Sequence, residues 1–144
     1  MVRISLGFWR VSLEAFTVKL STCLPRNNLG NAQAGLGAWR EASECYGRAA
    51  RLAPEFSFAA GNRALALYQL GDTQEAVREM RALLRRYPGF DDMRAALAGA
   101  LWALGKEGDA ETNWERVDDP RYKYVALCCK LCASRMHAQG LVVA

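Results

Sequence analysis

The chain has 144 residues, of which 51% are hydrophobic and 24% are charged, a balance that excludes extensive disorder and predicts a folded domain with its own core. Lys and Arg number 19 against 15 Asp and Glu, for a net charge of +4. No uncharged apolar run reaches the roughly 18 residues of a membrane span, and five unevenly spaced cysteines favour a reducing compartment over a disulfide framework.

Residues 1–24 are expected to form a basic N-terminal arm or leader. Arg3, Arg10 and Lys19 stand among several Ser and Thr residues, and Glu14 is the single acid in this segment. This composition is typical of an organellar targeting segment. Its apolar residues fit both strand alternation and helical spacing, so periodicity does not settle its structure.

Residues 25–122 contain an internal period. Pro54 and Pro88 are 34 residues apart, and two further series repeat with the same step. The series are Gly37, Gly71 and Gly105, each preceded by Leu, and Ala42, Ala76 and Ala110. The predicted repeats cover residues 25–56, 57–90 and 91–122.

Each repeat is predicted to be two helices joined by a tight turn. The residue just after a helix often takes a left-handed conformation that Gly adopts without a Cβ penalty, so the glycine series is expected to end the first helices. Pro54 and Pro88 follow the second helices, which proline cannot continue. Asp72 and Glu75 are expected to form a capping box at the start of one second helix.

Residue size predicts how the helices pack. Gly30 and Ala64 on first helices, with the alanine series on second helices, are expected to let the helices of a hairpin approach closely. The larger residues expected to fill the space between repeats are Leu29, Leu97, Tyr46, Met80, Leu83, Trp114 and Val117, together with Ala49.

These residues resemble the tetratricopeptide repeat (TPR) family. The resemblance is carried by residues 28–32, 37–42, Tyr46, Ala49 and Pro54, then Asn62, Ala64, Tyr68, Leu70, Gly71, Ala76 and Pro88, then Leu97, Ala98, Leu104, Gly105, Ala110 and Trp114. Pro25 and Arg26 depart from the family pattern at the start of the first helix. The resemblance implies an all-α fold, a right-handed superhelical TPR solenoid of helix-turn-helix repeats.

Residues 123–144 are expected to form a C-terminal capping helix and tail. Apolar residues recur at helical spacing between Arg121 and His137, and Lys123, Lys130 and Arg135 could supply the polar outer face that closes a solenoid.

The family resemblance also implies a function, that of a protein–protein interaction scaffold whose first helices line a concave groove, with no enzymatic activity and no cofactor. The implied groove residues are Asn27, Asn31, Phe58, Gly61, Leu65, Tyr68, Gln69, Asp92, Ala95, Gly99 and Trp102. Such a groove suits a peptide segment of a partner protein that inserts an apolar anchor, with Asn31 and Gln69 bonding to its backbone. The alternative is that Tyr68 and Trp102 pack between repeats as core.

One subset of the family binds the C-terminal carboxylates of heat-shock chaperones through two Asn and three basic side chains. Asn31 and Asn62 match the amide positions, but the basic positions hold Asn27, Asp92 and Ala96. Because no charge is left to neutralise a peptide carboxylate, this binding mode is not expected.

Sites for metal, nucleic acid, phosphate and catalysis have weaker signals. The group Cys128, Cys129, Cys132 and His137 holds one Cys-x-x-Cys half-site without a second pair. The basic stripe Arg78, Arg81, Arg85 and Arg86 is interrupted by acids and lacks interleaved aromatics, which favours a solvated face over nucleic-acid binding. Residues 99–107 lack the spacing and the Ser or Thr of a phosphate-binding loop, and the single His leaves no acid–base pair.

The leading hypothesis is therefore an adaptor or assembly factor that binds a peptide in its concave groove. The alternatives are self-association through the basic arm or the Cys-rich cap, and a thiol or metal-binding protein. Residues 119–123, Asp-Pro-Arg-Tyr-Lys, resemble those of short TPR proteins of oxygenic phototrophs, which implies a chloroplast location, with the cytoplasm as the alternative.

Overall fold

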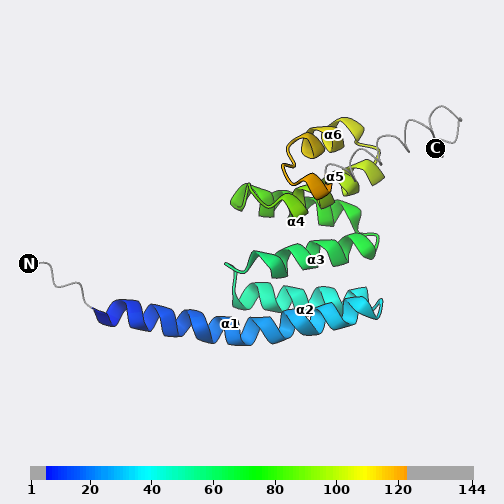
Figure 1. Ribbon diagram of the computed structural model, residues 1–144. Coiled ribbons are helices and arrows are strands. Elements are labelled where there is room, and N and C mark those ends of the chain that lie inside the picture. Colours follow the sequence, from blue (N-terminus) through cyan, green and yellow to red (C-terminus); the bar gives the residue numbers. More distant parts are fainter. Residues whose placement is uncertain (1–5, 123–144) are drawn as a thin grey trace, which may run out of the picture. The chain divides into compact units, whose positions relative to one another are not determined.

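The computed structural model describes residues 6–122, and within these residues every regular element is an α-helix (Figure 1). The helices are α1 (Leu6–Gly35), α2 (Trp39–Leu52), α3 (Ser57–Gln69), α4 (Thr73–Arg86), α5 (Asp91–Ala103) and α6 (Glu107–Glu115). The chain forms two compact units, Met1–Glu79 and Met80–Ala144, and the boundary between them falls within α4. The predicted all-α fold of helix-turn-helix repeats is confirmed.

The turns inside the three hairpins share one geometry. The φ angle is 76° at Gly37, 89° at Gly71 and 70° at Gly105. At the first turn, the glycine N–H donates to the Ala34 carbonyl at 3.0 Å and the Ala38 N–H donates to the Gln33 carbonyl at 2.9 Å. These are the two hydrogen bonds of a Schellman motif, and the same pair closes the other two turns. The predicted role of the glycine series is confirmed.

Backbone turns, rather than side-chain caps, precede four of the helices. Ala38, before α2, has φ −79° and ψ 65°, and the Trp39 N–H donates to the Gly37 carbonyl at 2.9 Å. This is an inverse γ-turn. Phe56, Phe90 and Lys106 have similar angles before α3, α5 and α6, and none of these four residues makes a side-chain cap hydrogen bond.

The capping box predicted at the start of α4 is not formed. The Asp72 N–H donates to the Leu67 carbonyl at 3.0 Å as part of the Schellman turn. The Glu75 carboxylate instead pairs with Arg78, one turn further along α4. The prediction was wrong because the preceding turn already uses the N–H group that Glu75 would have accepted.

In the first unit, α2 packs against both α1 and α3 (Figure 1). The closest approach is at Gly30 of α1, where an added Cβ would lie 2.6 Å from Cε1 of Tyr46. Tyr46 is 4% exposed, so its ring is buried against the α1 backbone. The predicted role of Gly30 in close helix packing is confirmed.

The core of the first unit consists mainly of small residues. One cluster contains Ala42, Tyr46 and Ala66, and a second contains Cys23, Ala49, Ala53 and Ala59. Leu29, predicted to be core, is 52% exposed. That prediction was wrong because α1 packs on α2 and Leu29 lies outside the contact.

In the second unit, α5 packs against α6. The predicted core residues Met80, Leu97, Trp114 and Val117 are all buried. Leu101 of α5 is also fully buried. The period therefore identified core residues of this unit.

Helix α1 is a single helix of 30 residues with Pro25 inside it. At about 1.5 Å per residue it is about 45 Å long, roughly twice the length of α2. In Figure 1 the N-terminal half of α1 extends past the end of α2. None of the described helices combines the length and apolarity needed to cross a bilayer.

The division into an arm at 1–24, repeats over 25–122 and a cap at 123–144 stays a prediction. Helix α1 crosses the first of these boundaries without a break. The expected capping helix and tail at 123–144 lie outside the described residues.

Candidate functional site

Side-chain amides of α1 and α3 meet in the first unit. The Asn62 Nδ2 group donates to Oδ1 of Asn27 at 3.1 Å and to Oδ1 of Asn31 at 3.4 Å. The Tyr46 hydroxyl also donates to Oδ1 of Asn31, at 2.9 Å. The pKa of Tyr46 is raised mainly by burial and to a smaller extent by the nearby Cys45. The hydroxyl therefore remains a donor at neutral pH. The predicted site residues Asn27 and Asn31 are thus held in place by contacts from α2 and α3.

This asparagine cluster, Asn27, Asn31 and Asn62, has a defined hydrogen-bonding polarity. Asn27 is 6% exposed, and a buried amide of this kind needs partners. The oxygens of Asn27 and Asn31 both accept from within the protein, whereas neither Nδ2 group is used in a hydrogen bond among the described residues. Asn31 is exposed, so its Nδ2 group can donate to a backbone carbonyl of a bound peptide.

Apolar side chains of α3 lie on the same helical face as Asn62. Phe58, Leu65 and Gln69 follow at spacings of seven and four residues, which places them on one side of the helix. Phe58 is 56% exposed and Leu65 is 39% exposed, and Gln69 is also exposed. Tyr68 is half-buried. The Phe58 ring contacts the Phe56 ring, with centroids 5.8 Å apart.

The remaining two predicted site residues belong to the second unit. Trp102 is half-buried and packs on Trp114, with ring centroids 5.4 Å apart at a tilt of 36°. Asp92 is exposed and accepts a hydrogen bond from the Tyr122 hydroxyl, which raises the pKa of Tyr122. Both side chains therefore have partners within their own unit, and their assignment to a groove stays a prediction.

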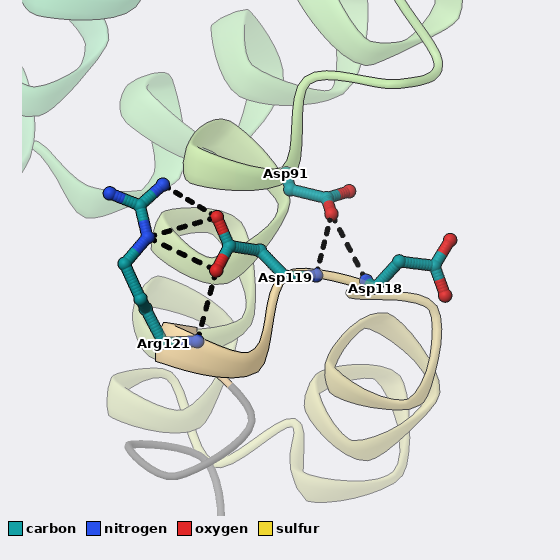
Figure 2. A network of polar contacts seen from close by, with 4 residues as sticks. All are labelled: Asp91, Asp118, Asp119 and Arg121. Carbon is teal, nitrogen blue, oxygen red and sulfur yellow. Dashed lines mark hydrogen bonds and ion pairs between the residues drawn. The ribbon is translucent and has the colours of Figure 1, made fainter.

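A second polar network fastens the chain after α6 to the start of α5 (Figure 2). Oδ2 of Asp91 accepts the backbone N–H groups of Asp118 and Asp119, each at 3.0 Å. The Asp119 carboxylate accepts the Arg121 backbone N–H at 2.9 Å and the Arg121 Nε–H at 3.0 Å. Hydrogen bonding to Arg121 lowers the pKa of Asp119.

Asp119 acts as a helix N-cap in this network. It accepts the N–H group two residues on, and Pro120 occupies the first helical position, where its missing N–H carries no cost. This gives a structural role to Asp119, Pro120 and Arg121 within the Asp-Pro-Arg-Tyr-Lys stretch.

An arginine-lined cleft in the first unit was missed by the sequence reasoning. Its main cavity of about 280 Å³ is lined by Ser43, Glu44, Gly47, Arg48, Arg51 and Arg63. A second cavity of about 220 Å³, lined by Arg26, Arg48, Arg51 and Leu52, shares two of these arginines. The only signal in the sequence was the pair Arg48 and Arg51, whose spacing of three puts them on one face of α2.

The other chemistries considered from the sequence have the following structural positions. In residues 6–122, no group of His, Cys, Asp and Glu side chains is arranged to hold a metal ion. Cys23 is buried and Cys45 is half-buried. The group Cys128, Cys129, Cys132 and His137 lies outside the described residues. In the basic stripe, Arg78 pairs with Glu75, and Arg81 pairs with Asp109 at 3.0 Å.

Comparison with known proteins supports the TPR-type fold. The sequence model of a family described as "Bacterial transcriptional activator domain" matches residues 29–120. No curated protein sequence matches the chain.

Several solved structures are similar. The TPR domain of Sgt2 from Aspergillus fumigatus has a TM-score of 0.71 at 17% identity, covering 85% of this chain and 85% of that one. The first TPR domain of human RPAP3 has a TM-score of 0.70 at 19% identity, covering 81% and 95%. The second TPR of Spaghetti (RPAP3), bound to the HSP90 peptide SRMEEVD, has a TM-score of 0.68 at 24% identity, covering 75% and 93%. The predicted TPR fold is confirmed.

Proposed function

The chain belongs to the bacterial transcriptional activator domain family, and from this membership and its TPR fold we propose that it is a protein–protein interaction scaffold that binds a peptide segment of a partner protein. The binding surface is formed by α1 and α3 of the first unit. In this role the protein acts as an adaptor or assembly factor.

The main support for this proposal is that exposed apolar side chains on α3 accompany an amide on α1 that is held by hydrogen bonds. Phe58 and Leu65 expose apolar surface on the face of α3 that also bears Asn62. Asn62 in turn bonds to Asn31, whose Nδ2 group is available. Apolar anchors beside an oriented backbone donor are the combination by which grooves recognise peptide segments.

The expected peptide differs from the one bound in a similar structure. The RPAP3 domain named above binds SRMEEVD, an acidic peptide of HSP90. In this chain Asn27 is nearly buried and uses its oxygen to accept from Asn62, and Asn31 accepts from the same Asn62 amide, so neutral amides occupy this surface. These groups favour a segment with apolar side chains over one with clustered carboxylates.

The family name adds a context for the partner. It refers to transcription activation. Contact with another protein suits this setting, because Arg78 and Arg81 are already paired with acids and present little free positive charge to a nucleic-acid backbone.

The test uses a random peptide library displayed on phage and selected on the wild-type protein. Selected peptides should lose binding to the Phe58→Ala/Leu65→Ala variant by about tenfold or more, since the apolar anchors contribute most of the affinity. The matched control is Val18→Ala/Leu36→Ala, which removes two other exposed apolar side chains and should leave binding unchanged. Equal loss in both variants, or in neither, contradicts the groove.

Self-association is a second candidate, favoured by the length of α1. The N-terminal half of α1 extends past the end of α2 (Figure 1). Val18, near the middle of α1, is 62% exposed. Light scattering coupled to size-exclusion chromatography tests it: a monomer at all concentrations rejects the candidate, and a dimer weakened by Val18→Glu supports it.

A further inference from the structure

The arginine-lined cleft of the first unit is built around Gly47. A Cβ added to Gly47 would lie 3.4 Å from Nε of Arg63 and 3.6 Å from Nη1 of Arg51. Two guanidinium groups, one from α2 and one from α3, therefore converge on the same point of the α2 surface. Gly47 is buried beneath them, and its missing side chain leaves the space that they occupy.

The charge of the cleft is only partly compensated. The two cavities are lined by Arg26, Arg48, Arg51 and Arg63, and the adjacent carboxylates are Glu44 and Glu79. Glu79 pairs with Arg63 at 2.9 Å. Arg26, Arg48 and Arg51 make no ion pair with any of the described residues. Four positive groups face two negative ones, so two positive charges remain.

Convergence of like charges favours an anion between them. Bringing guanidinium groups together costs free energy in the empty cleft, and a bound anion turns that cost into attraction. Arginine is also the side chain that best matches a tetrahedral oxyanion, because its fork of N–H donors can bond to two oxygens at once.

We propose that this cleft binds the phosphomonoester group of a phosphorylated Ser or Thr in a protein partner. Such a group carries a charge of about −1.5 to −2 at neutral pH and three strong acceptor oxygens, which complements two uncompensated positive charges. A cavity of about 280 Å³ holds a compact group of this size with its hydration water. The inference rests on the proposed function only in taking the ligand to be part of a protein.

A nucleic-acid strand fits the cleft less well. Its phosphodiesters carry one charge each along an extended backbone, and binding usually combines a long basic track with aromatic stacking surfaces. Here the arginines line compact cavities rather than a long track, and Glu44 is also a lining residue of the main cavity. The cleft also shares no residue with the predicted groove, so binding at the two surfaces can fail independently.

The test compares four probes on the full chain at low salt. They are a capped Ala-Ala-pSer-Ala-Ala peptide, its unphosphorylated counterpart, inorganic phosphate and a single-stranded oligothymidylate. Calorimetry should show that the phosphopeptide binds about tenfold or more tightly than either the unphosphorylated peptide or inorganic phosphate. The Nε–H NMR signals of Arg48, Arg51 and Arg63 should shift on addition of the phosphopeptide.

Two double variants distinguish the effect of the cleft arginines on binding from the effect of the net charge of the protein. Arg48→Ala/Arg51→Ala should lower phosphopeptide affinity by about tenfold or more. Arg85→Ala/Arg116→Ala removes the same charge from exposed positions of the other unit and should leave the affinity unchanged. Glu79→Gln should raise the affinity by freeing Arg63.

Three results would overturn the proposal. All three are measured on the wild-type protein, so they do not depend on whether a variant folds. They are equal affinity for the two peptides, affinity for inorganic phosphate as high as for the phosphopeptide, and preference for the oligothymidylate. Loss of library-peptide binding in the Phe58→Ala/Leu65→Ala variant bears on the groove alone.

Discussion

The ring of Tyr46 lies against the helix backbone at Gly30, where an added Cβ would be 2.6 Å from Cε1 and 2.7 Å from Cδ1 of the ring. Gly30→Ala should therefore destabilise the protein. Overpacking costs about 1–3 kcal/mol, and the gain in helix propensity offsets about 0.5–1 kcal/mol of it. Urea unfolding at neutral pH measures the difference.

The control for this prediction is Gly99→Ala. Gly99 lies inside α5 and nothing lies within 4 Å of an added Cβ. The same substitution should here stabilise by about 0.5–1 kcal/mol, because only the propensity gain remains. Equal effects at Gly30 and Gly99 would contradict the packing argument.

The turn glycines should be intolerant of side chains for a different reason. Gly71 has φ 89°, and an added Cβ would meet nothing within 4 Å, so the cost of Gly71→Ala comes from backbone conformation alone. That cost is about 1–2 kcal/mol. Gly35→Ala, at a helix end with equal space and no positive φ, should be nearly neutral, and urea unfolding of the two variants measures the difference.

Asp91 should matter for the stability of the second unit. Its carboxylate accepts the N–H groups of Asp118 and Asp119, and Asp91→Ala leaves both without this partner. The expected loss is about 1–3 kcal/mol, because the acceptor is charged and the Asp119 bond is partly buried. Hydrogen exchange should show faster exchange at these two amides, and unchanged rates there would contradict the network.

The Asp119–Arg121 pair predicts a direction for pH dependence. Hydrogen bonding to Arg121 lowers the pKa of Asp119 below the ordinary value of 3.8. The ionised form is thus favoured in the folded state, and its stabilisation is present above that ordinary pKa and lost as pH falls through the lowered one.

Asp119→Asn should remove this part of the acid dependence. The urea midpoint of the variant should fall less than that of the wild type when pH is lowered from about 5 to about 2.5. The effect should be small because the pair is exposed to solvent, and added salt should reduce it further. A steeper fall in the variant would contradict the assignment.

The parts of the fold that depend on single residues could be predicted from the sequence. The positions of Gly37, Gly71 and Gly105 located the three turns, because a left-handed residue is a local requirement that few side chains meet. Helix capping was harder to predict. The capping box at Asp72 satisfied the sequence rule, but the Schellman turn had already used the Asp72 N–H group.

Features that need several helices could not be read from the chain. The arginine-lined cleft joins Arg26, Arg48 and Arg63 from three helices, and only their packing shows that these side chains meet. The family resemblance pointed to Asn27, Asn31 and Asn62, but it did not show that Asn62 and Tyr46 donate to the oxygens of the other two. Pro25 marked a doubtful helix start in the sequence, whereas α1 runs through it.

The inverse γ-turns before α2, α3 and α5 have a consequence for sequence variation. Since main-chain hydrogen bonds start these helices and close the hairpin turns, each turn within a hairpin constrains little beyond one glycine. The residues beside that glycine can change identity without redirecting the backbone. Chains as little as 17% identical can therefore keep the same backbone path.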